Sequence, residues 1–594
     1  MEEIFKLYQE LHRLFGENDL GAEFCQQIHQ IIQEMIDRIP DEARIAIRPA
    51  GWDTRKLLEF FDFSGKNVVG IVDQQYRGDD YCGYPCFTTD SFPIESCDCV
   101  IVSSFYYHQA IKEEMETLHV PYVDYYDELG KWGIQLPIPY HFYWSHPQIV
   151  VNYFYLRYLR SEAGPQREIA LNALLQVAVE YKDFGLISSI YQDCDGEDGE
   201  FPLLKAAWRK SKQLLDRIQN KLQERKQKDI ILFWTDTVPY NKFHYLPETM
   251  NLSKQGTFFQ RAYAPAPYTN GTFRSMFRNM LPIDDFPQNQ EKINSENSPL
   301  IQFMENEGYK VRIIGNSELA IGKEHLLEVR LFDPCNVKWW KGIVDLLRSP
   351  EPCFYIFNFM ESHHPYYVPG LKEPVDHGAW WNATTKTEDF IKSAYGYMDQ
   401  CLQLYHRLLG NKTQIFLGDH GHFGPLSEWT MRPIEQMVHP YCFVVGENIP
   451  KITITRFFPY TNFEKFVRWI VDPAHFPLDD ACTDEVVVQD TDYYNSETID
   501  GFIQNDVEFL GLAYRGIINY EYKYVFNALG EEFFYQMQQD GSEKLVPLED
   551  PELRAELREK AGTKFLDIYQ YDKFRYTRKL YESINRKRLG RNAT

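Results

Sequence analysis

The sequence predicts an α/β protein that contains two separate α/β units, and two patterns indicate this. Short apolar segments rich in β-branched and aromatic residues alternate with segments of helical periodicity, first over residues 41–145 and again from residue 229 onward. Near the carboxyl terminus, residues 516–526 and 533–537 have the pattern of antiparallel strands. We therefore expect a helix-covered parallel sheet in each unit and a small antiparallel subdomain after the second.

The first unit is predicted from three strands and their helices. Residues 1–40 have helical periodicity, and the apolar segments 44–47, 67–73 and 99–104 follow as buried strands, with a helix over 51–61. This rhythm predicts a Rossmann-like α/β domain over residues 41–145. Residues 146–228 have mostly helical patterns, so we expect a helical connector there.

The turn after the first strand bears on cofactor binding by this unit. Arg48-Pro49-Ala50-Gly51 stands where a dinucleotide fold places its glycine-rich loop, and Asp73 ends the second strand at a suitable distance for a ribose hydroxyl. Only one glycine is present, and a proline and an arginine would obstruct the approach of a pyrophosphate. A nucleotide or sugar-nucleotide site and a simple scaffold both remain open, and we assign no cofactor-binding residue here.

The second unit is predicted over residues 229–594, with its carboxyl-terminal subdomain beginning at about residue 500. Its strands are expected at 229–234, 309–314, 354–359 and 414–417, separated by helical segments. Residues 548–560 have the pattern of a helix.

Composition excludes several classes of function. The 594 residues are 44% hydrophobic and 15% aromatic, which excludes a mostly disordered chain. The 62 Lys and Arg residues against 86 Asp and Glu residues give a formal charge of −24, which argues against a nucleic-acid partner and against binding to anionic membranes.

The amino terminus and the cysteines indicate a reducing compartment. Residues 1–6 do not start a signal peptide, and no run of 18 apolar residues predicts a membrane span. We therefore expect a cytoplasmic protein. Its 11 cysteines are scattered and form no CxxC pairs, so reduced thiols are a better interpretation than disulfides or a cysteine-bound zinc ion.

Four polar segments follow apolar strands of the second unit. They are the strand-end carboxylate Asp236, the segment that begins at Thr269, the segment 360–366, and the pair Asp419-His420. Each alone has a purely structural interpretation, as a helix cap, a turn or a packed loop. Because the carboxyl ends of parallel strands meet at one edge of a sheet, the four together predict one site.

The order and wording of these segments resemble the alkaline-phosphatase superfamily, in particular its sulfatase-like branch, over about residues 229–540. The matching positions are Asp236, the pair Asp419-His420, Gly308-Tyr309 with 313–315, the segment Ser362-His363-His364-Pro365, and the hairpin residues Arg515, 522–526 and 531–535. The resemblance implies a sulfatase-like α/β/α domain with a small antiparallel subdomain, and an enzyme that acts on an anionic ester.

The resemblance also implies a metal and a nucleophile. Sulfatases carry a cysteine or serine that is oxidised to formylglycine, and threonine cannot undergo that change. Thr269 at the aligned position is similar instead to the nucleophile of the phosphoethanolamine and lipoteichoic acid synthase-type transferases, which usually place glutamate where this chain has Asp236. The implied ligands of one divalent cation, Zn²⁺ or Mn²⁺ with Mg²⁺ or Ca²⁺ as alternatives, are Asp236, Thr269, Asp419 and His420.

Further residues are candidates for contacts with the substrate. His363, His364 and His439 are candidates for protonating the leaving group or contacting phosphate. Arg274 is a candidate for pairing with phosphate oxygens, with a surface role equally open, and Thr272 matches a serine of the transferases.

We therefore expect a metal-dependent phosphotransferase or phosphodiesterase whose anionic substrate is free or linked to a sugar or polymer. A sulfuric ester hydrolase and an inactive sulfatase-like binding module are the alternatives. The substrate, the acceptor and the oligomeric state stay open.

Overall fold

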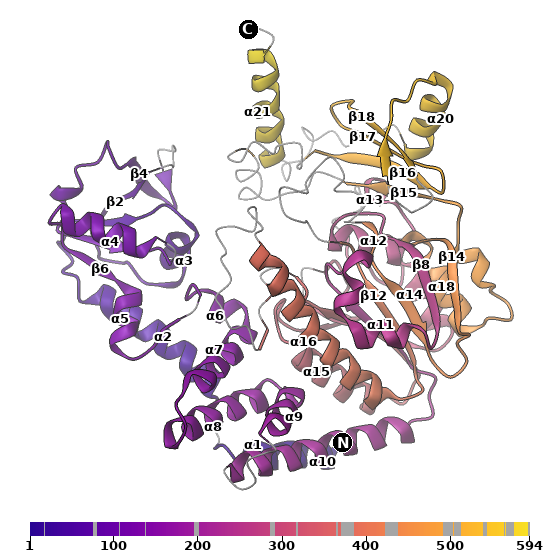
Figure 1. The fold of residues 1–594 in the computed structure, drawn as a ribbon, viewed down its shortest axis with the longest axis horizontal. Helices are drawn as coiled ribbons and strands as arrows, with labels where there is room; N and C mark the ends of the chain where they lie inside the picture. The colour runs from indigo at the N-terminus through magenta and orange to yellow at the C-terminus, as the bar shows by residue number, and fades with distance from the viewer. Residues whose placement is uncertain are drawn as a thin grey trace. The chain divides into compact units, whose positions relative to one another are not determined.

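The computed structural model describes residues 1–594 except 17, 75–79, 106, 137, 195–200, 286–290, 317–318, 364–365, 367, 370–384, 422–437, 491–502, 504–511, 538–542, 563–564, 566–574 and 592–594. The chain divides into two compact units, one mainly of Lys6–Lys212 and the other mainly of Gln213–Tyr366 and Ala379–Thr594. Figure 1 traces both units along the chain. No helix in the described part of the chain is long and apolar enough to cross a membrane.

The first unit contains a six-stranded sheet. Its strands are β1 (Ile45–Arg48), β2 (Val68–Asp73), β3 (Asp80–Tyr81), β4 (Tyr84–Thr88), β5 (Cys99–Val102) and β6 (Tyr122–Asp124). They lie in the order β3-β4-β2-β1-β5-β6, and all the described neighbours are parallel except β3 and β4. The strand order therefore reverses beside β1, which is where open α/β sheets leave a crevice.

Helices surround this sheet and continue beyond it. They are α1 (Glu2–His12), α2 (Leu20–Asp37), α3 (Trp52–Phe60), α4 (His108–Thr117), α5 (Tyr125–Lys131), α6 (Phe142–Ser145), α7 (Pro147–Arg160), α8 (Pro165–Glu180), α9 (Phe184–Asp193) and α10 (Pro202–Glu224).

Asp73, at the end of β2, accepts a hydrogen bond from the Ala50 amide at 3.0 Å. Its carboxylate is thus already engaged by the turn after β1, and nucleotide binding there stays a prediction.

The second unit is organised around an eight-stranded sheet. Its strands are β7 (Ile230–Thr235), β8 (Thr257–Tyr263), β9 (Lys310–Gly315), β10 (Leu326–Glu328), β11 (Cys353–Phe359), β12 (Thr413–Gly418), β13 (Cys442–Val445) and β14 (Ile452–Pro459). The order is β10-β9-β11-β7-β12-β13-β8-β14. Among these strands β13 alone runs against the others. The α/β class predicted from the sequence is confirmed.

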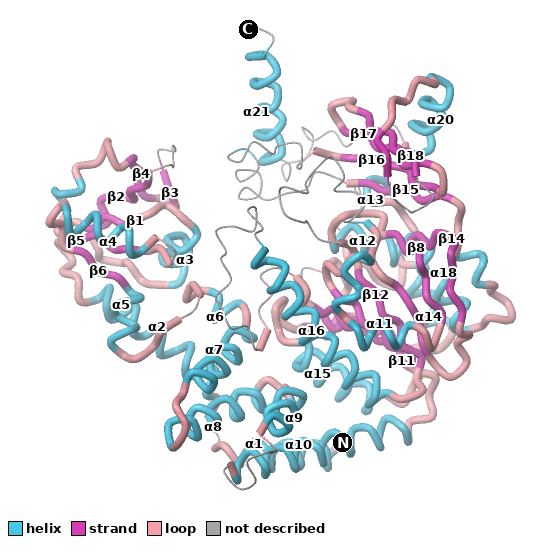
Figure 2. Tube along the Cα trace, viewed as in Figure 1, coloured by secondary structure: helices cyan, strands magenta, loops and turns pink. Residues whose placement is uncertain are grey.

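Helices cover both faces of this sheet, as Figure 2 shows. They are α11 (Pro247–Ser253), α12 (Thr269–Arg278), α13 (Pro282–Asp285), α14 (Pro299–Asn306), α15 (Cys335–Arg348), α16 (Thr385–Leu409) and α18 (Phe463–Val471). Strand β7 alternates between the two faces because successive side chains of a strand point to opposite sides. Trp234 packs in one core with Phe273 of α12, whereas Phe233 lies close to Trp339 of α15 and Tyr405 of α16.

The register of the three central strands brings their carboxyl ends to one level. Thr235, the last residue of β7, pairs with Phe359 of β11 on one side and with Gly418 of β12 on the other. The next residue of each strand therefore leaves the sheet at the same edge, and for β7 and β12 these residues are Asp236 and Asp419.

The carboxyl-terminal subdomain is antiparallel, as predicted. Its sheet consists of β15 (Glu485–Gln489), β16 (Tyr514–Asn519), β17 (Tyr522–Asn527), β18 (Glu532–Met537) and β19 (Glu543–Leu545), and the helices α20 (Pro551–Ala561) and α21 (Arg575–Arg591) follow. The sheet begins before residue 500, because β15 pairs with β16. The amide of Gln489 also donates to the carbonyl of Pro265 at 2.8 Å, so the subdomain contacts the loop that leads to α12.

A buried ion cluster lies at the starts of the central strands of the large sheet, opposite their carboxyl ends. Asp229 precedes β7, is fully buried, and accepts hydrogen bonds from Arg225 at 2.8 and 2.9 Å and from Lys412 at 2.7 Å. The Cys353 amide at the start of β11 donates to the same carboxylate at 3.0 Å. One acid thus links the starts of three neighbouring strands.

We expect Asp229→Ala to destabilise the second unit by about 3 kcal/mol, because it leaves two largely buried cations without their anion. The measurement is the midpoint of thermal unfolding of the full chain. Asp389→Ala is the control, since that carboxylate is 77% exposed and pairs with Lys392 at 3.8 Å at the protein surface. Equal midpoints for the two variants would contradict the role given to the cluster.

Candidate functional site

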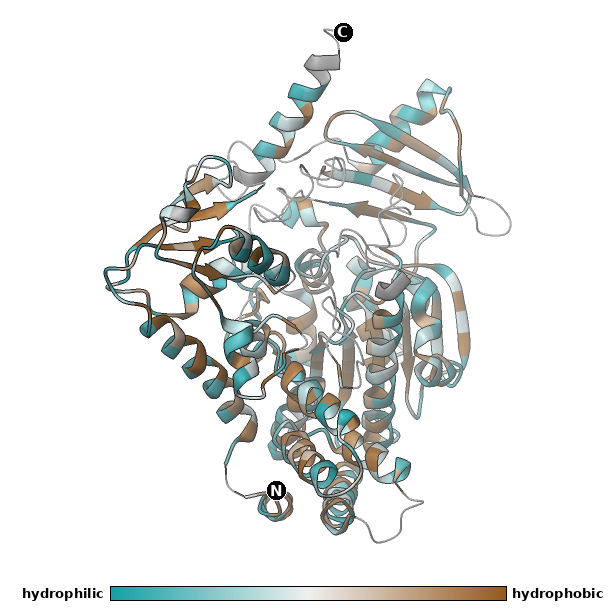
Figure 3. Ribbon diagram, turned by 60° about the vertical axis from the view of Figure 1, so that its left-hand side comes forward, coloured by the Kyte–Doolittle hydropathy of each residue, from teal (hydrophilic) through white to brown (hydrophobic). Residues whose placement is uncertain are grey.

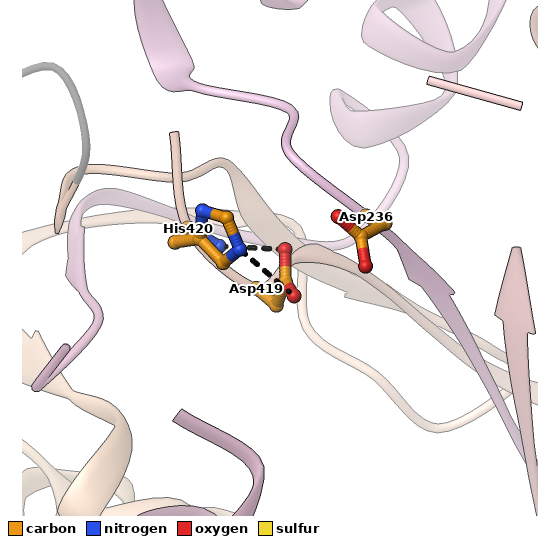
Figure 4. Close-up of side chains that lie close together, drawn as sticks. All are labelled: Asp236, Asp419 and His420. Atoms are coloured by element: carbon orange, nitrogen blue, oxygen red, sulfur yellow. Dashed lines mark hydrogen bonds and ion pairs between the residues drawn. The ribbon is translucent and has the colours of Figure 1, made fainter. Parts of the chain in front are cut away.

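Three ligand-type side chains gather at the carboxyl edge of the large sheet. Asp236 follows β7, and Asp419 and His420 follow β12; all three are buried. One ligand atom from each lies within 4.8 Å of the other two. Figure 4 shows the three side chains around one space. Asp236 thus meets a pair of residues that begins 183 positions later in the sequence, at the edge where the register of the strands predicts it.

Close backbone approach explains the glycine before Asp419. A Cβ atom on Gly418 would lie 2.3 Å from the carbonyl oxygen of Val238, so only glycine fits between β12 and the loop after β7. Asp419 is then fixed by two backbone donors, because its Oδ1 accepts from the amides of Thr237 at 2.9 Å and of His420 at 2.8 Å.

Thr237 has an unusual backbone conformation at this point. Its φ is +56°, which is uncommon for a β-branched residue and costs on the order of 1–3 kcal/mol. Three contacts hold it: its amide donates to Asp419, its hydroxyl donates to the Ser362 carbonyl at 2.8 Å, and its own carbonyl accepts from Tyr395 at 2.8 Å. The strained turn aims the Thr237 amide at the Asp419 carboxylate.

Thr269 reaches the cluster from the first turn of α12. Its Oγ1 lies 3.0 Å from Oδ2 of Asp236 and 3.2 Å from Nε2 of His420. Its side chain is only partly buried, so it lies between the buried carboxylates and solvent. The predicted convergence of Asp236, Thr269, Asp419 and His420 is therefore present in the structure.

The start of α12 suits an anion. Among the described residues no side chain caps this helix end, and the helix dipole favours negative charge there. Gly271 is needed in this turn because a Cβ atom would lie 2.7 Å from Ala266 Cβ and from the Tyr268 ring.

The two carboxylates are in an environment that suits a cation. Oδ1 of Asp236 and Oδ2 of Asp419 are buried and have no hydrogen-bond partner among the described residues. Burial, and secondarily the negative charge of Asp419, raise the pKa of the Asp236 carboxyl well above its usual range. Unsatisfied buried carboxylate oxygens are costly, and a divalent cation would satisfy both. The donor set therefore fits a metal ion.

The orientation of His420 fits the same interpretation. Its Nδ1 lies 2.6 Å from the carbonyl oxygen of Gly421, which can only accept a hydrogen bond. Nδ1 must therefore carry a proton, and in the neutral ring Nε2 has a free electron pair. Nε2 is the atom that faces Thr269, so it can accept the threonine proton or bind a metal.

Two predicted substrate contacts lie inside the fold around α12. The Thr272 hydroxyl donates to the Ala266 carbonyl at 3.1 Å. Arg274 is buried, forms an ion pair with Asp285, and donates to the Glu291 carbonyl at 3.0 Å. The surface role considered for Arg274 is therefore wrong, since packing against α13 and its partners buries the guanidinium. Its pairing with phosphate stays a prediction.

The three predicted histidines have different surroundings. His363 follows Ser362, whose hydroxyl donates to the Asp236 carbonyl, and is partly buried. His364 lies outside the described residues. His439 is stacked between Tyr240 and Tyr263 at 4.8 and 4.7 Å, and burial lowers its pKa to about 4. A neutral ring is a poor proton donor, so this placement favours packing over catalysis for His439.

Sequence analysis missed the supporting residues. Lys338 of α15 is fully buried, donates to the carbonyls of Leu331 at 2.9 Å and Asn358 at 2.8 Å, and contributes positive charge toward Asp236. A lysine on the buried face of an amphipathic helix was the available signal. Nothing local marked Thr237, because its role depends on a residue from another strand.

No family model matches the chain, and no curated protein matches its sequence. Solved structures similar to it include a protein in the alkaline phosphatase superfamily from Vibrio parahaemolyticus, which is 12% identical over 58% of this chain and 93% of that one, with a TM-score of 0.40. A phosphonate monoester hydrolase from Silicibacter pomeroyi is 11% identical over 56% of this chain and 94% of that one, with a TM-score of 0.43. Another, from Agrobacterium radiobacter, is 11% identical over 57% of this chain and 96% of that one, with a TM-score of 0.42. The superfamily that the sequence motifs resemble is thus named among the structures similar to this chain.

Proposed function

We propose that this protein is a metal-dependent phosphotransferase or phosphodiesterase that uses Thr269 as its nucleophile. The observation that carries the proposal is the position of the Thr269 hydroxyl, which lies 3.0 Å from Oδ2 of the buried Asp236 carboxylate and 3.2 Å from Nε2 of His420. A hydroxyl beside a carboxylate and an imidazole, at a helix end that favours anions, is arranged to attack an anionic ester.

The proposed ligands of a divalent cation are Asp236, Asp419 and His420, with Thr269 as a fourth. When bound, the cation would lower the pKa of the threonine hydroxyl and neutralise charge on the phosphoryl group. Zn²⁺ or Mn²⁺ suits this mixture of oxygen and imidazole ligands.

The proposed reaction has two steps. First, the Thr269 oxygen forms a bond to phosphorus, its proton passes to the Asp236 carboxylate, and the ester bond to the leaving group breaks. Second, the oxygen of water or of an acceptor hydroxyl forms a bond to phosphorus, and Thr269 leaves and regains a proton. His363 is our candidate for protonating the first leaving group, because Ser362 anchors its segment to the backbone of Asp236.

The carboxylates should bind metal and gain stability from it. We expect added Mn²⁺ or Zn²⁺ to raise the free energy of unfolding of the wild-type chain by about 2–3 kcal/mol at saturation, and so to raise its thermal midpoint. Asp236→Asn and Asp419→Asn should lose this response. Binding should tighten as pH rises, because the raised pKa of Asp236 means that a proton must leave before the cation binds.

The measurements are the thermal shift and the metal content of the dialysed protein. Asp399→Asn is the matched control, since Asp399 is also buried but accepts hydrogen bonds from Thr249 at 2.6 and 2.8 Å. A wild-type chain that binds no divalent cation would favour the inactive binding module.

Thr269→Ala should lower turnover of bis(p-nitrophenyl) phosphate by at least about 10³-fold while metal content stays at the wild-type level, because the nucleophile is lost but the carboxylates remain. Thr269→Ser should keep part of the activity. Intact-mass measurement after mixing with substrate should find a phosphoryl adduct on the Thr269 peptide of the wild-type chain only. Full activity of Thr269→Ala excludes this nucleophile, and faster turnover of p-nitrophenyl sulfate favours the sulfuric ester hydrolase.

His363→Gln should separate proton donation from phosphate contact. If His363 protonates the leaving group, the variant loses about 10²-fold on an alkyl phosphodiester, whose alkoxide needs a proton, and little on the p-nitrophenyl ester, whose phenolate does not. Equal losses on both substrates would instead assign His363 to phosphate binding. The measurement is kcat for the two esters.

A further inference from the structure

A tyrosine of α16 reaches the candidate site from the inner face of that helix. The buried residues of α16 recur at intervals of three and four, as in a helix that packs on one side: Ile391, Tyr395, Met398, Leu402 and Tyr405. Figure 3 shows hydrophobic and hydrophilic residues alternating in this way along the helices of the chain. Tyr395 is fully buried, so its hydroxyl needs a hydrogen-bond partner inside the protein.

The partner of Tyr395 is the turn that follows β7. Its hydroxyl donates to the carbonyl oxygen of Thr237 at 2.8 Å. Thr237 has a left-handed φ of +56°, which a β-branched residue keeps only where its surroundings hold it. Helix α16 thus supplies one of the contacts that keep the backbone of Thr237 in an unfavourable conformation.

That conformation decides how Asp419 is held. The amide of Thr237 donates to Oδ1 of Asp419 at 2.9 Å, whereas Oδ2 has no hydrogen-bond partner in the described part of the chain. Rotation of Thr237 to an ordinary negative φ would turn this amide away from the carboxylate. The orientation of one proposed cation ligand therefore depends on a backbone torsion that Tyr395 helps to fix.

Two neighbouring carbonyls accept hydrogen bonds from hydroxyls of the same kind, but without strain. The Asp236 carbonyl accepts from the hydroxyl of Ser362, and the Gly418 carbonyl accepts from that of Tyr460 at 2.8 Å. Neither Asp236 nor Gly418 has a positive φ. Loss of a hydroxyl there leaves the backbone in a favourable conformation, whereas loss of the Tyr395 hydroxyl removes a contact that opposes strain.

We propose that Tyr395 is a positioning residue for the candidate metal site: by holding the turn at Thr237, its hydroxyl fixes the Asp419 carboxylate in the orientation that binds the cation. This inference rests on the proposed function. Tyr395 acts through Thr237 and Asp419 and needs no contact of its own with the cation or the substrate. Removing a group that orients a metal ligand changes metal affinity by about 10–100-fold.

The test is the affinity of the full chain for Mn²⁺, measured by titration of the metal-free protein. Tyr395→Phe keeps the aromatic ring and removes the hydroxyl, and we expect it to weaken Mn²⁺ binding about tenfold. Tyr405→Phe is the matched control, since Tyr405 lies on the same helix, is also buried, and donates to Asn336 at 2.6 Å instead of to the turn. This control should bind Mn²⁺ as the wild type does.

Two further measurements separate positioning from a general loss of structure. In the metal-free protein, the Thr237 amide should exchange its hydrogen at least about fivefold faster in Tyr395→Phe than in the wild type, as read by mass spectrometry with fragmentation. Glycine adopts a φ of +56° without steric cost. In a Thr237→Gly background, Tyr395→Phe should therefore weaken Mn²⁺ binding by about twofold or less.

Four outcomes would overturn the proposal. These are Mn²⁺ binding in Tyr395→Phe that equals the wild type, an equal loss in Tyr405→Phe, a loss of about tenfold in the Thr237→Gly background as well, or an unchanged exchange rate of the Thr237 amide. A wild-type chain that binds no Mn²⁺ would contradict the proposed function instead. The exchange rate of the Thr237 amide would then still decide whether Tyr395 holds the turn, so the two failures stay distinct.

Discussion

The structure depends most on two buried carboxylates, Asp236 and Asp419, that face a common space without enough donors to satisfy them. Taking two like charges out of water is costly, and burial, with the charge of Asp419 beside it, raises the pKa of the Asp236 carboxyl. The fold nevertheless holds both in place, through the register of β7 and β12 and through the Thr237 amide. A site of this kind is organised for a cation and does not stabilise the protein by itself.

The two edges of the large sheet have different roles. At the starts of the strands, Asp229 satisfies Arg225 and Lys412 in a closed ion cluster. At the carboxyl edge, Thr237 has a strained backbone, and one oxygen each of Asp236 and Asp419 has no hydrogen-bond partner in the part of the chain that the structure describes. The satisfied ion cluster and the groups that are unfavourable on their own thus lie at opposite edges of the same sheet.

An acidic chain that acts on an anionic ester must supply positive potential locally. The candidate sources near the site are a bound cation and the amides at the start of α12. The phosphate contact predicted for Arg274 would compete with its ion pair to Asp285, since both groups are buried. In the proposed function, the anion-binding role therefore falls first on the backbone amides at the start of α12 and on a bound cation.

The sequence by itself determined the α/β class, the central strands of both sheets and the antiparallel subdomain, and its resemblance to a known family predicted the four residues that meet at the sheet edge. Apolar periodicity and strand-end polar residues are local signals, so they can be recognised in one chain. Only the tertiary structure decided that Arg274 is buried against Asp285, that His439 lies between two tyrosine rings, and that Thr237 and Lys338 support the carboxylates. These roles arise from strand pairing and helix packing between segments far apart in the sequence, which no local pattern encodes.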